Sequence, residues 1–319
     1  MQTVQTQKPR ILALVGATAS GKTVLSLALA QSLGCEILCM DSMQIYRRMD
    51  IGTAKPTPAE QTAAPHHLLD IVEPTEAFSV AQYVEAAHDV IRGVLARGHI
   101  PLLVGGTGLY LRGLSLPMDY GGLPSDPALR AELQALLDRD GAQRMHELLA
   151  EIDPPTAARL HPNDTRRVIR AIEIYRLTGA PMSAHRVPDA ADGPYDFQVF
   201  AIDWPRAELH RRINLRVDQM MADGLAAEVQ ALLNSGVTPE MQSMQGLGYK
   251  ELAPVLLRGA PLADAVEQIK TGTRNYARRQ LIWFRRDARV RWIASERLPE
   301  AKDIIIKIWE DPASWISNR

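Results

Sequence analysis

The chain has 319 residues, 46% of them hydrophobic and 23% charged, with a formal net charge of −1. This length suits about two domains, and the composition is typical of a globular protein. The polar N-terminus does not resemble a signal peptide, and no window approaches the roughly 18 apolar residues of a membrane helix. We therefore expect a cytoplasmic protein without a membrane segment, with Cys35 and Cys39 as buried thiols because their spacing suits neither zinc nor a disulfide framework.

The first predicted elements are a strand at 11–15, a glycine-rich turn at 16–23 and a helix at 24–33. The turn matches the phosphate-binding loop pattern G-x-x-x-x-G-K-[ST] in its proper strand, turn and helix setting. The N–H groups of such a loop bind phosphate oxygens, its lysine reaches the outer phosphates, and its threonine can ligate Mg²⁺. We predict a diphosphate or triphosphate site with Mg²⁺ on Thr23, formed by Gly16, Ala17, Thr18, Ala19, Ser20, Gly21, Lys22 and Thr23.

Further strands are predicted at 35–39, 68–72 and 101–104. An apolar stripe of 3.6-residue period from Val80 to Leu95 predicts a helix that is capped by Ser79 and stopped by Gly98. Alternating strands and helices are typical of a parallel sheet covered by helices, an α/β fold. Ligands of such folds bind at the carboxyl ends of the strands.

Acidic residues and a second glycine-rich turn follow these predicted strands. Asp41 can be an acid that holds Mg²⁺ through water, a general base or a turn cap, and Asp70 competes for the metal role. For His66 and His67 a hydrogen-bonded loop role is favoured over a metal site, because no cluster of ligands surrounds them. The glycines around Thr107, at 105–108, either let a ligand approach the backbone or form a tight strand-to-helix turn.

From 118 to 194 the strand signals disappear, which indicates a helical insertion domain with helices at 127–137, 143–152, 155–160 and 165–178. Residues 1–117 and 195–319 then form the core domain. Its second part is predicted to hold strands at 197–202 and 290–294 and helices at 206–221, 225–233, 262–284 and 301–309.

Arginines are concentrated in a few segments of this nearly neutral chain. Three lie in the segment 166–170, and the densest run, 274–291, also contains Tyr276, Trp283 and Phe284. A single arginine is best explained as a solvated side chain, but the whole set favours binding to nucleic acid. From the residues alone, a phosphate-loop kinase of a small metabolite and a nucleotide-switched RNA-binding protein remain alternatives.

Several motifs in this order resemble the tRNA dimethylallyltransferases over nearly the whole chain. They are the phosphate loop and the segments 41–47, 50–56, 65–68, 105–110, 163–167, 216–220, 246–250 and 279–280. The resemblance implies Mg²⁺-dependent transfer of a dimethylallyl group from its diphosphate to N6 of the adenosine 3′-adjacent to the tRNA anticodon. It also implies a catalytic role for Asp41, as general base, and for Arg216 and Thr107.

The resemblance further implies which residues contact tRNA, with the insertion gripping the anticodon arm. We expect a monomer, and we derive no role for Thr53, Lys55, His66 or His67. The implied tRNA-binding residues are Asp41, Ser42, Met43, Gln44, Thr107, Arg130, Arg166, Arg167, Val168, Ile169, Arg170, Gln245, Gly246, Leu247, Gly248, Tyr249, Lys250, Arg278, Arg279, Gln280, Trp283 and Arg285.

Overall fold

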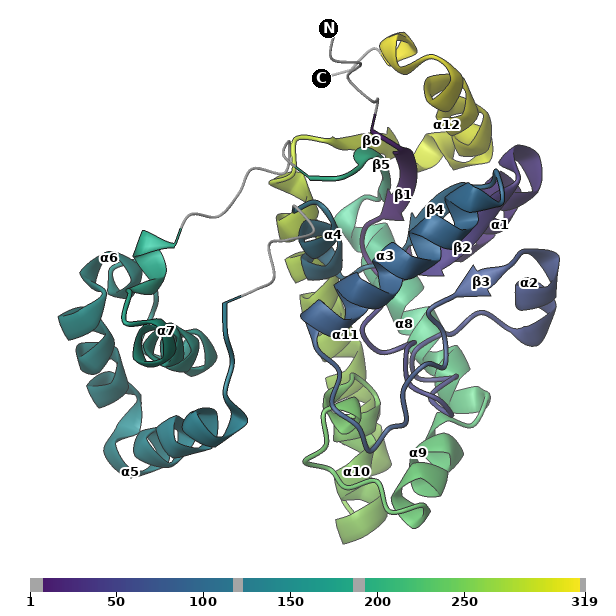
Figure 1. The fold of residues 1–319 in the computed structure, drawn as a ribbon. Coiled ribbons are helices and arrows are strands. Elements are labelled where there is room, and N and C mark those ends of the chain that lie inside the picture. The colour runs from purple at the N-terminus through teal and green to yellow at the C-terminus, as the bar shows by residue number, and fades with distance from the viewer. Residues whose placement is uncertain (1–7, 117–122, 186–192, 316–319) are drawn as a thin grey trace, which may run out of the picture. The chain divides into compact units, whose positions relative to one another are not determined.

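The structure, a computed structural model, describes residues 8–116, 123–185 and 193–315 (Figure 1). It divides into two compact units, which we call the core unit (Met1–Ser115 with Gly193–Arg319) and the insertion (Leu116–Asp192). Each is described by itself. Among the described residues, no helix combines the length and the apolar character that crossing a bilayer requires.

The core unit is built on a six-stranded sheet with the order β3-β2-β4-β1-β5-β6, in which every ladder is parallel. This is the predicted α/β fold, and the predicted strands other than that at 68–72 are confirmed within a residue or two of their ends. The strands are β1 (Arg10–Val15), β2 (Cys35–Cys39), β3 (His66–His67), β4 (Ile100–Val104), β5 (Asp196–Asp203) and β6 (Val290–Ala294).

Helices cover both faces of the sheet, as the alternation of side chains along β1 shows. Ile11, Ala13 and Val15 pack toward α3 (Val80–Ala96) and α4 (Gly108–Leu114). Leu12 and Leu14 pack on the other face toward α1 (Lys22–Leu33) and α12 (Ala301–Glu310). Burial on both faces is typical of a central parallel strand. The helix α3 begins with the predicted Ser79 cap, which forms a capping box with Gln82.

A second group of helices extends from the carboxyl edge of the sheet (Figure 1). It comprises α8 (Arg206–Ala222), α9 (Leu225–Asn234), α10 (Tyr249–Arg258) and α11 (Leu262–Arg285), which share a core with Ile45, Tyr46 and Met49. The sequence did not predict α10, α4 or the short α2 (Pro58–Ala63). The helix α10 contains Pro254 and starts at a glycine, both of which weaken a helix signal.

The predicted strand at 68–72 is wrong, because β3 ends at His67. Leu68 and Asp70 have φ angles of 63° and 54°, which turn the chain out of the sheet. Lys55 Nζ holds the bend by donating to an Asp70 carboxylate oxygen at 2.6 Å. Val72 then meets Tyr46 in an isolated bridge.

The insertion shows no strand between residues 123 and 185. It consists of α5 (Pro127–Ile152), α6 (Pro154–Ala157) and α7 (Thr165–Thr178) around a core that includes Leu133, Met145 and Ile172. Gly141, at φ 82°, interrupts α5 between the two helices that the sequence predicts there. The predicted helix at 155–160 is shorter than expected, since α6 ends at Ala157.

Candidate active site

The phosphate loop joins β1 to α1 at the carboxyl edge of the sheet. Gly16 and Gly21 have φ angles of 123° and 95°, and Ala19 has 62°, so the backbone curls as a phosphate loop requires. The helix α1 starts at Lys22 with no side-chain cap at Gly21. Its first N–H groups are therefore directed at the loop's interior, where an anion would be stabilised.

Protein side chains hold the loop from its outer side. Trp204 donates from Nε1 to the Ser20 carbonyl at 3.0 Å, and Arg212 donates from Nε to the Ala19 carbonyl at 2.8 Å. The Arg212 guanidinium also stacks 4.2 Å from the Trp204 ring. These donors satisfy carbonyl groups on the outside of the loop, which keeps its N–H groups facing inward.

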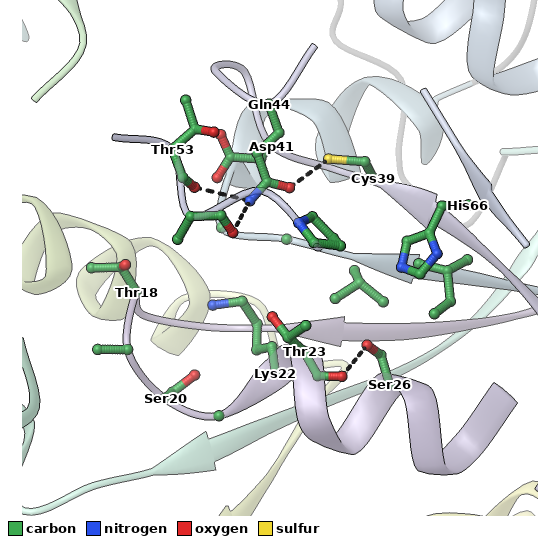
Figure 2. A pocket seen from close by; sticks show the side chains of 18 of the residues that line it. Thr18, Ser20, Lys22, Thr23, Ser26, Cys39, Asp41, Gln44, Thr53 and His66 are labelled. Carbon is green, nitrogen blue, oxygen red and sulfur yellow. Dashed lines mark hydrogen bonds between the residues drawn. The ribbon is translucent and has the colours of Figure 1, made fainter. Parts of the chain in front are cut away.

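Lys22 is the charged centre of the loop. Its Nζ donates to the Gly16 and Ala17 carbonyls at 3.2 and 2.6 Å. Burial, and to a lesser extent the nearby Arg216, lower the pKa of Lys22 to about 8, while Asp41 opposes the shift. In Figure 2 the amino group points from α1 into a cavity, toward the wall that carries Asp41 and Thr53. A phosphate there would replace two neutral acceptors by a charged one.

This phosphate cavity has a volume of about 70 Å³ and is lined by the loop residues 18–23 together with Asp41, Arg216 and the apolar Ile37 and Val104. The Ser20 hydroxyl is buried in its wall and has no hydrogen-bond partner among the described residues. Arg216 likewise forms no ion pair with any residue that the structure describes. Polar groups without partners beside a phosphate loop indicate a binding site for an anion.

Asp41 follows β2 and stands at this cavity. Its Oδ1 accepts from the Met43 N–H at 2.9 Å, so the predicted turn-cap role is real, but the residue also lines the cavity. Burial raises the pKa of Asp41, partly offset by the Met43 hydrogen bond and by the positive charge of Lys22. Thr107 Oγ1 accepts from the Ser42 N–H at 3.1 Å and thereby anchors the backbone beside this carboxylate.

A second cavity, of about 310 Å³, shares Thr18, Asp41 and Arg216 with the phosphate cavity. All of the predicted residues 245–250 line it, as do Ser42 and Met43. Val217 and Met220, from the motif at 216–220, also line it. The sequence did not single out the other helical residues of this wall, Leu225, Ile269 and Thr273, because they lie on ordinary amphipathic helices without a motif.

The motif at 50–56 forms part of both walls and is fixed by two charged side chains, the half-buried Glu228 and the buried Lys55. Glu228 accepts from the backbone N–H groups of residues 50, 51 and 52 and, at 2.6 Å, from the Tyr249 hydroxyl. Lys55 is buried and pairs with Asp50 and Asp70, each at 2.6 Å. Asp70 is therefore engaged by Lys55 and lines neither cavity, so its predicted competition for the metal role is not supported.

The two histidines point to different surroundings. His66 lines the phosphate cavity, donates from Nδ1 to the Ala64 carbonyl (2.8 Å), and has a pKa lowered by burial. His67 Nε2 lies 2.6 Å from the buried Glu36. Both are hydrogen-bonded, but they form the strand β3 and not the loop that the sequence predicted. Within the described residues no cluster of three or more His, Cys, Asp or Glu side chains could hold a metal.

The turn at 105–108 needs its glycines for packing. A Cβ on Gly105 would collide with the Met40 backbone, one on Gly106 with Gln280, and one on Gly108 with the Trp283 ring. Gly105 and Gly106 also line the phosphate cavity, but neighbouring protein atoms already explain why no side chain is present. Of the two explanations that the sequence left open, the tight turn is the better supported.

Several residues implied to contact tRNA are buried in the structure. Val168 and Ile169 belong to the core of the insertion, with 0% and 4% of their surface exposed. Gln280 is also buried, and its side-chain amide bonds to backbone groups of residues 18 and 106. Gln44 donates to the carbonyls of residues 53 and 54. Gln44 is half-buried and lines the phosphate cavity, whereas Val168, Ile169 and Gln280 do not offer a free surface to RNA.

The arginines separate into two groups. Arg130 and Arg170 both bond to Glu173, which is fully buried in the insertion. Arg167 pairs with Asp164 at 3.3 Å and Arg285 with Asp203 at 3.1 Å, both on exposed surfaces. By contrast, Arg166 and Arg278 have no ion pair among the described residues, and Arg279 lines the second cavity.

A phosphate loop, a buried carboxylate beside it and an adjoining larger cavity, all at the carboxyl edge of a parallel sheet, define a P-loop enzyme that acts on a substrate with at least a diphosphate. Family models narrow this class: residues 44–287 match the IPP transferase model and residues 9–71 the isopentenyl transferase model. The chain belongs to the tRNA dimethylallyltransferase family.

Individual relatives support this family assignment. The chain is 45% identical to a tRNA dimethylallyltransferase of Pelotomaculum thermopropionicum over 95% of this chain and 96% of that protein. It is 47% identical to tRNA dimethylallyltransferase 1 of Trichlorobacter lovleyi, covering 90% and 94%.

Solved structures show the same fold. A tRNA isopentenylpyrophosphate transferase from Bacillus halodurans has a TM-score of 0.71 at 40% identity, covering 96% of this chain and 98% of that one. A eukaryotic dimethylallyltransferase acting on tRNA has a TM-score of 0.80 at 27% identity, covering 96% and 80%. Family membership favours prenyl transfer over the kinase and RNA-switch alternatives.

Proposed function

We propose that this enzyme transfers a dimethylallyl group from dimethylallyl diphosphate to the N6 amine of the adenosine 3′-adjacent to the anticodon in tRNA, giving N6-(dimethylallyl)adenosine. One observation carries the proposal: Asp41 and Arg216 line both the phosphate cavity and the second cavity. A carbon leaving the diphosphate in the first cavity would therefore meet a nucleophile held in the second beside a carboxylate.

The phosphate cavity supplies what departure of the diphosphate requires. The allylic carbon–oxygen bond breaks with both electrons going to the leaving oxygen, and positive charge develops on the carbon. Lys22, Arg216 and the loop N–H groups are placed to stabilise the negative charge that appears on the diphosphate. Neither cation forms an ion pair with another described residue, so both are available to the leaving group.

The phosphate cavity also suits a Mg²⁺ ion. Mg²⁺ is usually held by one or two protein oxygens, several waters and substrate phosphates, and does not need a dedicated cluster. The Thr23 hydroxyl would hold it directly, and the unpartnered Ser20 hydroxyl lies in the wall of the same cavity. When bound, Mg²⁺ supplies further neutralisation of the diphosphate.

The second cavity suits an extruded adenine. Removing a base from its stack costs a few kcal/mol, which contacts in the pocket must offset. The side chains of Met43, Met220 and Tyr249 provide an apolar wall for the base, and Arg279 lies at the same cavity for its phosphates. The N6 nitrogen forms the new bond to carbon and passes its proton to Asp41, whose raised pKa makes it a stronger base than an exposed carboxylate.

The remaining RNA contacts belong to the insertion and to α11. We propose that the insertion grips the anticodon arm through Arg166, and that Arg278 and Arg279 on α11 bind phosphates from the core unit. Arg166 and Arg278 have no ion pair with any described residue, which leaves their charges available to RNA.

The test is a product assay with unmodified tRNA, Mg²⁺ and either dimethylallyl diphosphate or ATP labelled at the γ-phosphate. We expect prenylated adenosine and released diphosphate with the first donor, and no phosphoryl transfer with the second. The Lys22→Met variant serves as the control for a contaminating activity. Transfer of the γ-phosphate to an acceptor, without prenylated RNA, would overturn the proposal.

A further inference from the structure

Gln280 occupies an unusual position for a residue of an arginine-rich helix. It lies on α11 with 5% of its surface exposed. Its Oε1 accepts from the Thr18 N–H in the phosphate loop at 2.9 Å, and its Nε2 donates to the Gly106 carbonyl at 3.0 Å. One side-chain amide therefore joins the two glycine-rich turns of the active site.

We propose that Gln280 is a positioning residue of the transfer reaction. It fixes the position of the phosphate loop relative to the turn at 105–108, which anchors the base Asp41. This inference rests on the proposed function, since it needs a reaction in which the diphosphate and Asp41 must act on the same substrate pair. It replaces the RNA contact that the sequence resemblance implies for Gln280.

The connection to Asp41 runs through Thr107, the residue after Gly106. Thr107 donates its N–H to the Met40 carbonyl at 3.2 Å, and its Oγ1 accepts from the Ser42 N–H at 3.1 Å. Both neighbours of Asp41 are thus bonded to Thr107. A shift of the turn at 105–108 would move the Asp41 backbone, and the Gln280 amide prevents that shift relative to the loop.

The packing around Gly106 supports a dedicated place for this amide. A Cβ on Gly106 would collide with Gln280 Nε2, so the glycine is required by the glutamine side chain. The other end of the amide satisfies a loop N–H that would otherwise be directed at the ligand or left unpaired. Because Gln280 fits both turns at once, its geometry determines their separation.

The helix α11 also carries residues of the second cavity next to Gln280. Arg279 is its chain neighbour and Tyr276 lies one turn before it, and both line the second cavity. A helix transmits displacement along its length because its backbone is rigid. RNA bound at Arg279 and diphosphate bound at Thr18 are therefore connected through Gln280. This residue would fix the position of the acceptor RNA relative to the diphosphate donor.

The decisive variant is Gln280→Ala, compared with Gln268→Ala, an exposed glutamine of the same helix. A misplacement of about 1 Å costs on the order of 100-fold in rate. We expect the single-turnover rate of Gln280→Ala to fall about 10- to 100-fold, with the Kd for tRNA within about twofold of the wild type. Gln268→Ala should match the wild type in both.

A second arm keeps the test informative if Gln280→Ala unfolds. Gly106→Ala should be strongly impaired, because its methyl group meets the glutamine amide, and Gly106→Ala with Gln280→Ala should recover activity relative to Gly106→Ala alone. Gln280→Glu keeps the acceptor for Thr18 but places a carboxylate against the Gly106 carbonyl, so we expect it to be slower than Gln280→Ala.

The outcomes separate this inference from the proposed function. If wild-type enzyme forms no prenylated tRNA, the proposed function fails. If wild type is active and folded Gln280→Ala turns over at the wild-type rate, the positioning role is wrong. Loss of tRNA affinity that accounts for the whole loss of rate would instead make Gln280 an RNA contact, and absence of recovery in the double variant would show that Gly106 and Gln280 are not coupled.

Discussion

The two glycine-rich turns of this active site look alike in sequence but need glycine for different reasons. In the phosphate loop, Gly16 and Gly21 have positive φ angles, and an added Cβ would meet no atom closer than 3.7 Å. In the turn at 105–108, the glycines stand where a Cβ would collide with Met40, Gln280 or Trp283. The first turn uses glycine for its backbone conformation, and the second uses it for close approach by other parts of the protein.

This difference predicts how variants should behave. Changes to groups that face the ligand should lower activity without lowering stability, since the native protein gains little from them. Changes at the packing turn should lower both. A buried charge held for a ligand even costs stability in its absence. The following experiments test whether activity and stability separate in this way.

The largest effect is expected at Asp41, which lines the phosphate cavity and whose two chain neighbours are bonded to Thr107 of the second turn. Asp41→Asn keeps an oxygen for the Met43 N–H but cannot accept the proton from N6. A general base contributes about 10²- to 10⁴-fold, so the single-turnover rate should fall by that factor. Because burial raises the pKa of Asp41, its ionised form is disfavoured in the folded state, and the free energy of unfolding at neutral pH should not decrease. A rate loss matched by weaker tRNA binding would mark Asp41 as structural.

Lys22→Met should separate activity from stability most clearly. Loss of one stabilising charge at the leaving group costs about 10²- to 10³-fold in rate. The pKa of Lys22 is lowered from 10.5 to about 8, so the unfolded state holds its proton more tightly and the charge opposes folding at pH 7. We expect the free energy of unfolding in urea to rise by about 1–3 kcal/mol. A less stable, inactive variant would contradict the distinction between the turns.

A direct comparison of the two turns uses one alanine in each. Gly105→Ala places a methyl group against the Met40 backbone, which cannot rotate away, and should cost about 3 kcal/mol of unfolding free energy or more. Gly21→Ala makes only ordinary van der Waals contacts but must adopt a left-handed conformation, which costs about 1–2 kcal/mol. Urea unfolding of both variants measures which substitution lowers the free energy of unfolding more. A larger loss of stability for Gly21→Ala than for Gly105→Ala would contradict the packing explanation of the turn at 105–108.

The decrease of kcat/KM at alkaline pH should be determined by Lys22 of the phosphate loop alone. Above a pH of about 8 the free enzyme loses the Lys22 proton, so kcat/KM for dimethylallyl diphosphate should fall about tenfold per pH unit. Lys22→Arg, which stays protonated, should lack this alkaline decrease even if its rate is lower. Gly106→Ala should lower the whole profile without moving its alkaline limb. An unchanged limb in Lys22→Arg would assign it to another group.

Sequence patterns predicted most of the structural features that depend on residues close together in the chain. The phosphate loop, the Ser79 cap and the strand at 290–294 were recognisable because conformation, capping and burial leave their signals within a few residues. The roles of Glu228, Gln280 and Trp204 were not, since each bonds to a segment far away in the chain. The strand predicted at 68–72 failed for the same reason, because Lys55 determines the conformation there.

The distinction between packing and ligand groups extends to the arginines, where the smallest effect is expected. Arg130 bonds to the buried Glu173, so Arg130→Ala leaves this carboxylate with Arg170 as its remaining ion-pair partner and should destabilise the insertion while the salt dependence of tRNA binding stays the same. Arg166 has no ion pair among the described residues, and if it contacts one phosphate, Arg166→Ala should reduce the slope of log K against log salt by about 0.7–0.9. Binding titrations between 50 and 200 mM salt, roughly the range over which such slopes are measured, distinguish the two. A reduced slope for Arg130→Ala with an unchanged one for Arg166→Ala would show that the paired arginine, and not the unpaired one, binds RNA.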